Sequence, residues 1–495
     1  MHYFNSVRGV IPFFRTTLFW ALLAVSLPAV AQPAPVLTWV TNSSVKLEQV
    51  IGDVDWATGS NTVSQTVTRF NIVANDLGCS FVNGANLLFL FGDTRGSNVD
   101  YNGGDPVAWS TTRNGEQGLL MNFFTNGVGS NVFIDPQGIS MAGDDTPNAG
   151  ISISNVIYLV CNTGSDTSLT NARADDYSVL VTFDEATLSF QTNRTLSVTT
   201  NGGHFVFDSL HSYGTNVLIF GEGNYRNSDI YLATVPASSF LSGAGTLYFN
   251  GLTNGQPAWT AVETDAVPVV QDNPSNGPPW PGDSPTVGHL SVIYSTTLDL
   301  WLMTYDGGRN AANTTGIYFS CASVPWGPWS TPQLIFNPAR DHGFGVFIFN
   351  PNDRPTGPAG PTADPNKHNP TNTVGTVYAP FLIEPFTTIS NSTLYLYYTM
   401  STWNPYTVVK MRSAFTILPV IDPTSLVKLK KKFSFAWMAP TNITYQVDYS
   451  TNLLKGWATL TNLITSTNGA FNFTDGGTNS GGFGNTKFYR LHSSP

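Results

Sequence analysis

The stretch Phe70–Gly96, FNIVANDLGCSFVNGANLLFLFGDTRG, is the part of the sequence from which the rest of the chain can be interpreted. Two apolar runs flank the turn sequence Asn83–Asn86 (NGAN), which predicts a strand–turn–strand hairpin. Asp76 stands before the first run and Asp93 directly after the second. The two carboxyl groups are therefore expected near the same end of the hairpin.

The register of the hairpin decides whether these carboxyl groups meet. A four-residue loop pairs Val82 with Leu87 and sets Asp76 directly opposite Asp93. A two-residue loop pairs Val82 with Ala85 and places the two aspartates diagonally. Both registers put the carboxyl groups on one face, whereas a slip of one residue would separate them.

Opposite and diagonal positions correspond to roughly 5 Å and about 7–8 Å between side chains. Two carboxyl groups at such distances suit glycoside hydrolysis by acid/base or nucleophilic catalysis. The structural alternative is that Asp76 accepts backbone N–H groups beside Gly78 and that Asp93 caps a turn with Thr94. The hairpin alone leaves both interpretations open.

The N-terminus has the pattern of an export signal. His2, Arg8 and Arg15 precede the apolar run Leu18–Leu27, and the small residues at 29–31 (AVA) offer a cleavage site. The apolar run is short for a membrane span, and no later stretch approaches ~20 uninterrupted apolar residues. We therefore expect residues 1–31 to be a signal peptide and the protein to be secreted, periplasmic or on the cell surface.

Composition favours an exported all-β protein. Charged residues make up 11% of the 495 residues, aromatic residues 13%, and there are 45 glycines. Such a chain has many turns and few long charged helices. The formal net charge is −10 and no basic stripe is visible, so nucleic acid is not an expected partner.

The three cysteines, Cys79, Cys161 and Cys321, lie far apart and form no CxxC motif. Neither a disulfide framework nor a zinc site is indicated, and at most one bridge can form. We expect buried thiols.

From Val63 a multi-stranded unit recurs, with later copies beginning near His204, His289 and Val377. Five units of roughly 70–90 residues fit the length, which predicts a five-bladed β-propeller over residues 32–425. Because identities between the units are weak, a pair of β-sandwiches remains the alternative. A new alternating pattern after the lysine cluster 428–432 predicts a small C-terminal β-sandwich module over residues 433–495.

Five motifs make the chain resemble a known family. In chain order they are NDLG at Asn75–Gly78, LFGDT at Leu90–Thr94, WLMTY at Trp301–Tyr305, YAPFLI at Tyr378–Ile383 and YYTMSTWNPY at Tyr397–Tyr406. The family is DUF4185, first known as a domain of unknown function and now grouped with glycoside hydrolases of the endo-D-arabinanase type. The resemblance implies a five-bladed propeller with a central cleft.

The resemblance also implies the catalytic groups, which are Asp76 and Asp93 here, and it favours inversion of configuration. Which aspartate is the acid and which the base stays open. One motif departs from the family, which often has Gly-Glu-Leu-Ser where this chain has Gly288-His289-Leu290-Ser291. His289 is therefore expected to affect activity or substrate choice.

Further candidates for substrate binding lie at the starts of units or in the loop of the last unit. They are His289, Asp208, Asp283, Trp403, Asn404 and Tyr378, with His204 and Tyr406 as weaker ones. Aromatic residues among them could stack on sugar rings, although they also suit packing between blades. Glu222 and Arg226 are expected to pair with each other.

Two classes of function follow. The first is an exported glycoside hydrolase that cleaves arabinofuranosyl linkages in a D-arabinan-like polysaccharide. The second is a non-catalytic propeller that binds glycan or cell-wall polymer, since propellers host both. We expect the protein to be a monomer and its partner to be a polysaccharide substrate. No cofactor is expected, and the sequence leaves open whether a structural calcium ion is bound.

Overall fold

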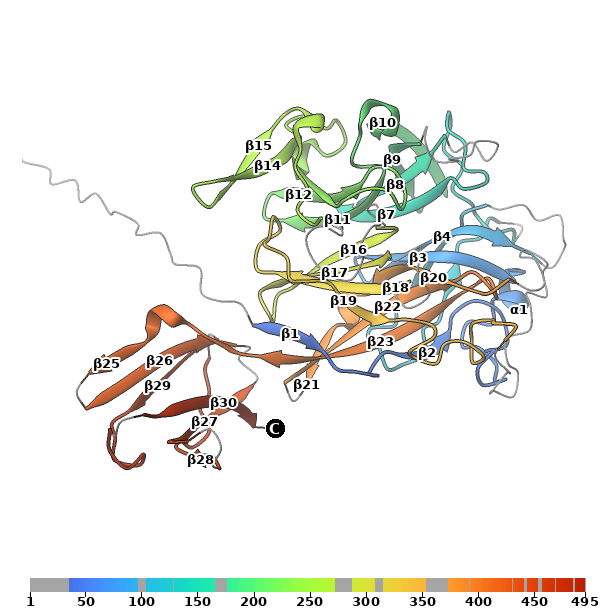
Figure 1. Ribbon diagram of the computed structural model, residues 1–495. Helices are drawn as coiled ribbons and strands as arrows, with labels where there is room; N and C mark the ends of the chain where they lie inside the picture. Colours follow the sequence, from blue (N-terminus) through green and yellow to red (C-terminus); the bar gives the residue numbers. More distant parts are fainter. Residues whose placement is uncertain are drawn as a thin grey trace, which may run out of the picture.

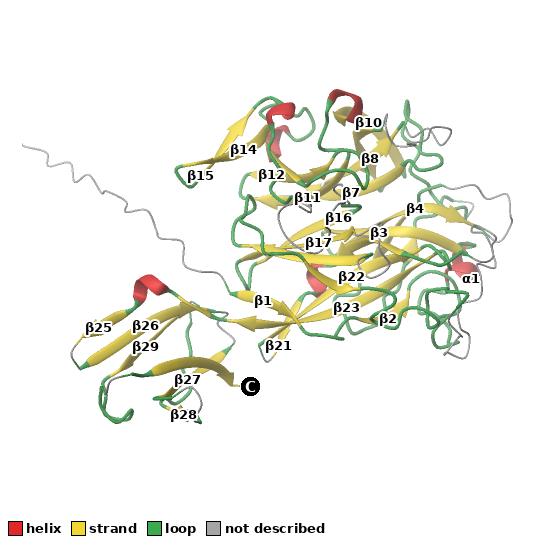
Figure 2. Cartoon of the chain, in the orientation of Figure 1, coloured by secondary structure: helices red, strands yellow, loops and turns green. Residues whose placement is uncertain are grey.

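The structure is a computed structural model that describes residues 35–96, 104–127, 129–164, 176–271, 287–307, 315–352, 373–390, 392–429, 431–439, 443–452, 456–467, 469–483 and 486–494. The expected signal peptide lies outside these residues. Within them the chain is all-β, as predicted, its named strands pair antiparallel, and the single α-helix is α1 (Thr66–Phe70). Five short 3-10 helices are described, at Thr199–Asn201, Ala237–Ser239, Glu263–Asp265, Glu384–Phe386 and Pro423–Ser425. Figure 2 shows strands as the main regular structure, joined by loops and a few short helical turns. No helix in the described ranges has the length and apolar character to cross a membrane.

Five larger sheets form the main body (Figure 1), and in four of them each strand pairs with the next along the chain. The first has β3 (Ala74–Asn83), β4 (Asn86–Arg95), β5 (Val107–Ser110) and β6 (Asn122–Phe123); the second has β7 (Thr146–Ile153), β8 (Val156–Thr163), β9 (Tyr177–Asp184) and β10 (Ser189–Val198). The third has β11 (Phe207–Tyr213), β12 (Asn216–Glu222), β13 (Tyr231–Pro236), β14 (Leu247–Thr253) and β15 (Gln256–Thr260); the fourth has β16 (Leu290–Ser295), β17 (Leu300–Gly307), β18 (Gly316–Ala322) and β19 (Gln333–Phe336).

The fifth sheet combines both ends of the main body. It contains β20 (Val377–Leu382), β21 (Thr388–Ser390), β22 (Thr393–Thr402) and β23 (Thr407–Leu418), together with the N-terminal strands β1 (Val36–Trp39) and β2 (Val45–Gln49). Both N-terminal strands pair with β23. The sheet therefore depends on residues more than 350 positions apart.

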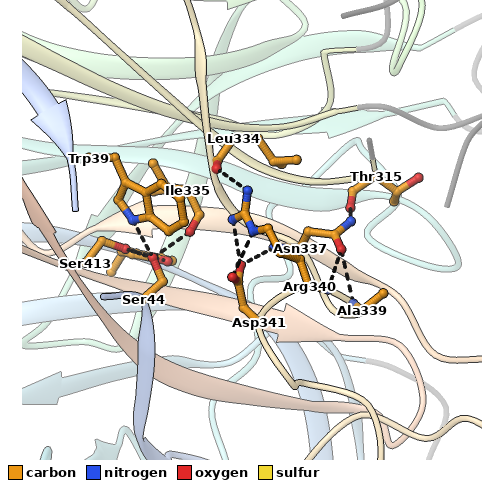
Figure 3. Close-up of polar contacts among 11 residues, drawn as sticks. Trp39, Ser44, Thr315, Leu334, Ile335, Asn337, Ala339, Arg340, Asp341 and Ser413 are labelled. Carbon is orange, nitrogen blue, oxygen red and sulfur yellow. Dashed lines mark hydrogen bonds and ion pairs between the residues drawn. The ribbon is translucent and has the colours of Figure 1, made fainter. Parts of the chain in front are cut away.

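Hydrogen bonds join this fifth sheet to the fourth sheet (Figure 3). Ser44 Oγ donates to the carbonyl of Ile335 at 2.6 Å and lies 2.6 Å from Ser413 Oγ, while Trp39 Nε1 donates to Ser44 Oγ at 3.1 Å. Beyond β19, Arg340 binds the carboxylate of Asp341 at 2.7 Å. Each buried hydrogen bond contributes about 1 kcal/mol net to stability, so the Ser44 bonds help to hold the two sheets together.

The first strands of the five sheets contact one another in cyclic order: β3 contacts β7, then β11, β16 and β20 follow, and β20 contacts β3. Serine hydroxyls join neighbouring members of this ring. Ser80 Oγ donates to the carbonyl of Leu382 at 3.0 Å, and Ser291 Oγ accepts the Leu382 N–H at 3.0 Å. Ser209 Oγ accepts the Val292 N–H at 2.9 Å. These buried bonds explain why polar residues stand in otherwise apolar strands.

The β3–β4 hairpin differs from its predicted register. Val82 pairs with Leu87 as one prediction required, but a bulge between Leu77 and Cys79 shifts the pairing, so Asp76 stands opposite Gly92 rather than Asp93. Leu77 and Gly78 have positive φ angles of 65° and 92° at this bulge. Both predicted placements of the aspartates, opposite and diagonal, were therefore wrong, because one extra residue entered β3.

The C-terminal residues form two further, smaller sheets. One contains β24 (Val420–Ile421), β25 (Val427–Leu429), β26 (Lys432–Met438) and β29 (Ala470–Asp475); the other contains β27 (Thr444–Ser450), β28 (Ala458–Thr459) and β30 (Phe488–Ser494). Trp437 stacks on Phe471 at 5.4 Å and meets Tyr445 edge-on at 5.8 Å, which joins the sheets through an aromatic core. Figure 1 shows the two sheets beside β1, apart from the larger ones.

The three cysteines are buried free thiols, as predicted. Burial raises the pKa of the Cys79 thiol to about 12, so it stays protonated.

Candidate active site

A cavity of about 280 Å³ lies at the N-terminal ends of four of the five first strands. It is lined by Asp76, Leu77, Asp93, Asp144, Thr146, Tyr225, Arg226, His289, Thr376, Tyr378, Trp403 and Tyr406. Asp76 belongs to β3, Thr146 begins β7, His289 precedes β16 and Tyr378 belongs to β20. The cavity thus gathers residues from widely separated parts of the sequence.

Asp76 and Asp93 both line this cavity in spite of the shifted register. The bulge brings Asp76 opposite Gly92, where a Cβ atom would lie 2.5 Å from Asp76 Oδ1. Only glycine fits opposite Asp76. The sequence Gly92-Asp93 therefore supplies both the space for one carboxyl group and the second carboxyl group.

Two tyrosines hold the Asp76 carboxylate. Tyr378 donates its hydroxyl to Asp76 Oδ2 at 2.8 Å, and Tyr406 also donates a hydrogen bond to Asp76. Burial, followed by the negative charge of Asp76, raises the pKa of both tyrosines well above the ordinary value. Both phenols therefore remain protonated donors, and such bonds stabilise the ionised form of a carboxyl group.

Asp105 lies close to Asp93 and is fully buried. Burial raises its pKa well above the ordinary value, and the charges of Asp93, Asp76 and Asp145 add to this effect. These effects favour the protonated form of Asp105, next to the half-buried Asp93. Asp105 was not predicted from the sequence, because an isolated aspartate after Gly104 belongs to no motif.

Arg226 pairs with Asp306, and the predicted pairing with Glu222 was wrong. The guanidinium donates to Asp306 Oδ2 from Nε at 3.3 Å and from Nη2 at 3.1 Å. Burial raises the pKa of Asp306, while the charge of Arg226 and the Ala379 N–H, which donates to Oδ1 at 3.1 Å, lower it. A buried carboxylate with these partners is strongly held in place.

His289 lies in the cavity wall with little exposure. Its Nδ1 is 3.2 Å from the hydroxyl of Tyr225 and 3.8 Å from Asp306 Oδ1. The rings of Tyr225 and Phe381 lie 5.0 Å and 5.9 Å from the imidazole. The histidine is therefore packed between aromatic rings beside the Arg226–Asp306 pair.

The other predicted substrate contacts divide into two groups. Tyr378, Trp403 and His289 line the cavity with Asp76 and Asp93. Asp208 and Asn404 do not line it: Asn404 is buried and donates from Nδ2 to the Thr373 carbonyl at 2.7 Å. Asp283 lies outside the described residues.

Asp208 occupies the position in the third sheet that Asp76 occupies in the first. It pairs across β11 and β12 with Gly221, as Asp76 pairs with Gly92. Burial raises the pKa of Asp208 well above its ordinary value, with a smaller effect from Glu263. Only the Asp76 copy of this arrangement reaches the cavity.

Several cavity residues were missed by the sequence analysis: Asp144, Thr146, Tyr225 and Thr376 were not considered, and Arg226 was given another partner. Tyr406, which ends the YYTMSTWNPY motif, was among the weaker candidates and lines the cavity. The others lie in loops or at strand starts without a distinctive pattern. Among the described residues, no group of three or more His, Cys, Asp or Glu side chains is arranged to hold a metal ion.

A second cavity, of about 290 Å³, lies among all five first strands, β3, β7, β11, β16 and β20. It is lined by the serines that join the strands, including Ser80, Ser209 and Ser291, and by His211 and Glu384, which are 3.5 Å apart. Its serine oxygens already bind neighbouring backbone. It holds no pair of aspartates, so the first cavity is the better candidate for an active site.

Comparisons with solved structures found similar chains of low sequence identity. A family-43 glycoside hydrolase described as thermostable has 15% identity and a TM-score of 0.36, over 70% of this chain and 91% of that one. An exo-β-1,3-galactanase from Phanerochaete chrysosporium has 9% identity and a TM-score of 0.38, over 90% and 93%. An endo-1,5-α-L-arabinanase from Thermotoga petrophila RKU-1 has 8% identity and a TM-score of 0.38, over 82% and 98%.

No curated protein matches the sequence. The family comparison is more informative, because a single match covers all five sequence motifs and every residue of the candidate site. Residues 61–412 match the family described as "Domain of unknown function (DUF4185)", and the chain therefore belongs to the DUF4185 family.

Proposed function

We propose that the protein is a glycoside hydrolase that cleaves arabinofuranosyl linkages in a D-arabinan-like polysaccharide. The observation that carries the proposal is that Asp76 and Asp93 line one cavity together with Tyr225, Tyr378, Trp403 and Tyr406. Two carboxyl groups can supply the acid and the base of glycoside hydrolysis, and aromatic rings can stack on sugars.

The five larger sheets are proposed to be the blades of a five-bladed propeller. This is supported by the cyclic contacts of β3, β7, β11, β16 and β20 and by the pairing of the N-terminal strands with β23. In such an arrangement the candidate site lies at one end of the central axis.

Asp76 is proposed as the general base and Asp93 as the general acid. The two phenol bonds favour the carboxylate form of Asp76, which is the form that removes a proton from water. Asp93 then gives its proton to the leaving glycosidic oxygen as the bond to the anomeric carbon breaks and water adds there. Attack of water on the opposite face inverts the configuration.

The charge of the cavity favours a neutral glycan. Asp76, Asp93 and Asp144 line it, and the cation among its described lining residues, Arg226, is already paired with Asp306. A uronic acid or a sulfated sugar would meet uncompensated negative charge at short range. An unsubstituted arabinan carries no charge.

Export is part of the proposal. It rests on the signal-like sequence of residues 1–31, and a polysaccharide outside the cell requires an enzyme that reaches it. N-terminal sequencing of the protein recovered from the culture medium or periplasm should find the first residue near Gln32.

The test is incubation of the purified protein with D-arabinan, L-arabinan and arabinogalactan, followed by sizing of the products. We expect shortened products from D-arabinan. The anomeric configuration of the first product, read from its proton NMR signal, should be inverted relative to the substrate. Binding to one of these polymers without any change in its size would identify a non-catalytic glycan-binding propeller instead.

A further inference from the structure

We propose that Asp306 is a positioning residue of the candidate active site. It orients Arg226, which binds the substrate, and it positions Asp76, the proposed base. This inference rests on the proposed function. Asp306 does not line the cavity, and only 2% of the residue's surface is exposed. It acts through two separate connections, one from each carboxylate oxygen.

The first connection runs from Oδ2 to Arg226. Nε and Nη2 of Arg226 bind this oxygen at 3.3 Å and 3.1 Å, and the guanidinium lies over the Tyr225 ring at 4.8 Å. The Arg226 side chain is one-quarter exposed and lines the cavity. Asp306 thus fixes the plane of the guanidinium and leaves Nη1 for a substrate hydroxyl.

The second connection runs from Oδ1 through the backbone to Asp76. Oδ1 accepts the N–H of Ala379, a buried residue with a positive φ of 51° at the bulge of β20. A left-handed conformation at a non-glycine residue persists only where its surroundings hold it. The preceding residue is Tyr378, whose hydroxyl binds Asp76 Oδ2 at 2.8 Å. The Asp306 contact therefore stabilises the backbone conformation that points the Tyr378 hydroxyl toward Asp76.

The backbone around Asp306 is shaped for its carboxylate. A Cβ atom on Gly288 would lie 2.2 Å from Asp306 Oδ2, so only glycine allows the carboxylate this position. Gly288 N–H also donates to the Asp306 carbonyl at 2.8 Å. The carboxylate lies where the third, fourth and fifth sheets meet, which makes it the shared support of groups from all three.

The two connections can be separated by substitution. Asp306→Asn keeps an acceptor for the Ala379 N–H but loses the charge that pairs with Arg226, so KM for D-arabinan should rise about tenfold or more while kcat changes little. Asp306→Ala loses both connections, so kcat should also fall about tenfold. Arg226→Met should reproduce the KM effect alone, and Tyr378→Phe the kcat effect alone.

Combined variants test whether the effects share one origin. Asp306→Asn with Arg226→Met should raise KM no further than either change alone, since both break the same contact. The matched control is Asp55→Asn, because buried Asp55 also pairs with a cation, Lys46 at 2.5 Å, and accepts backbone N–H groups, but it does not line the cavity. This control should lower the melting temperature and leave KM and kcat unchanged.

Unchanged kinetics in folded Asp306→Asn and Asp306→Ala variants would overturn the inference, as would additive KM effects in the combined variant. If the wild-type protein binds D-arabinan oligosaccharides without cleaving them, the proposed function fails separately. Calorimetric titration then decides the inference: equal weakening of binding by Asp306→Asn and Arg226→Met supports it, and wild-type affinity in Asp306→Asn contradicts it.

Discussion

At the scale of single residues, the candidate site depends on glycines that leave room for carboxyl groups. Gly92 stands opposite Asp76 and Gly221 stands opposite Asp208, so both carboxyl groups fold over a strand that carries no side chain there. The two aspartates differ in their partners. Asp76 receives phenol hydrogen bonds in the cavity, whereas Asp208 is buried away from it.

The two aspartates of the cavity should be separately essential. Asn is nearly the same size as Asp but cannot exchange a proton, so Asp76→Asn and Asp93→Asn should each reduce kcat by ~10²–10⁴-fold with little loss of stability. Asp208→Asn is the matched control, because it changes an aspartate in the same structural position outside the cavity. Near-normal turnover in both cavity variants would remove the catalytic role.

Asp208 should also make stability depend on pH. Its pKa is raised in the folded protein, so above pH ~4 the folded state holds a proton that the unfolded state releases. Folding stability is then lost as pH rises towards the folded pKa, by up to ~1.4 kcal/mol per pH unit. Asn imitates the neutral acid and does not titrate.

The melting temperature of Asp208→Asn should therefore rise relative to that of the wild type as pH increases from 4 to 7. Thermal unfolding followed by circular dichroism at several pH values measures this difference. A constant difference across the range would show that Asp208 is not protonated in the folded state.

At the scale of elements, the bulge of β3 is the feature that positions Asp76. Gly78 has a φ of +92°, and a Cβ atom there would lie 3.3 Å from Thr399 of β22. Thr399 Oγ1 donates to the Gly78 carbonyl at 2.9 Å, which ties the bulge to the fifth sheet. The hairpin register is thus set by its contact with a strand more than 300 residues later.

Gly78→Ala should reduce both stability and activity. The left-handed conformation costs an Ala about 1–2 kcal/mol, and the close contact with Thr399 adds about 1–3 kcal/mol. Gly84→Ala in the turn of the same hairpin is the control, since its φ is +57° and no atom lies within 4 Å of a Cβ there.

Chemical denaturation should show a loss of about 1–2 kcal/mol for Gly84→Ala and about 2–5 kcal/mol for Gly78→Ala, with a fall in kcat only in the latter. Equal losses of stability and unchanged turnover in both variants would mean that the bulge does not position Asp76.

At the scale of the whole molecule, the last sheet joins the two ends of the main body. β1 and β2 complete the sheet of β22 and β23, and Ser44 connects them to β19. The C-terminal sheets follow β23 and contribute no residue to the candidate cavity. The chemistry is therefore expected to reside in the main body.

A chain that ends at Ser425 should keep its turnover on soluble D-arabinan. Changes at distant, independent sites have little effect on one another, so we expect kcat and KM within about twofold of the full-length values. Kinetics on soluble polymer, with circular dichroism as the control for folding, provide the test. A truncated chain that stays folded but loses turnover would show that the C-terminal sheets support the site.

The sequence alone predicted the all-β class, the β3–β4 hairpin, the buried thiols and membership of the DUF4185 family. It left two hairpin registers open, and the structure has the one that pairs Val82 with Leu87. These features follow from local signals. Alternation of apolar residues specifies strands, turn residues specify hairpins, and motif order specifies a family.

Contacts between sheets, and not the sequence pattern, select which polar residues meet. Tyr378 and Asp76 are 302 residues apart in the chain, and Arg226 and Asp306 are 80 residues apart. Asp76 and Asp208 each stand opposite a glycine, yet of the two only Asp76 lines the cavity. A bulge, a buried ion pair and the choice between two equivalent aspartates depend on contacts between sheets, because strand periodicity fixes the face of a residue but not the neighbour it meets.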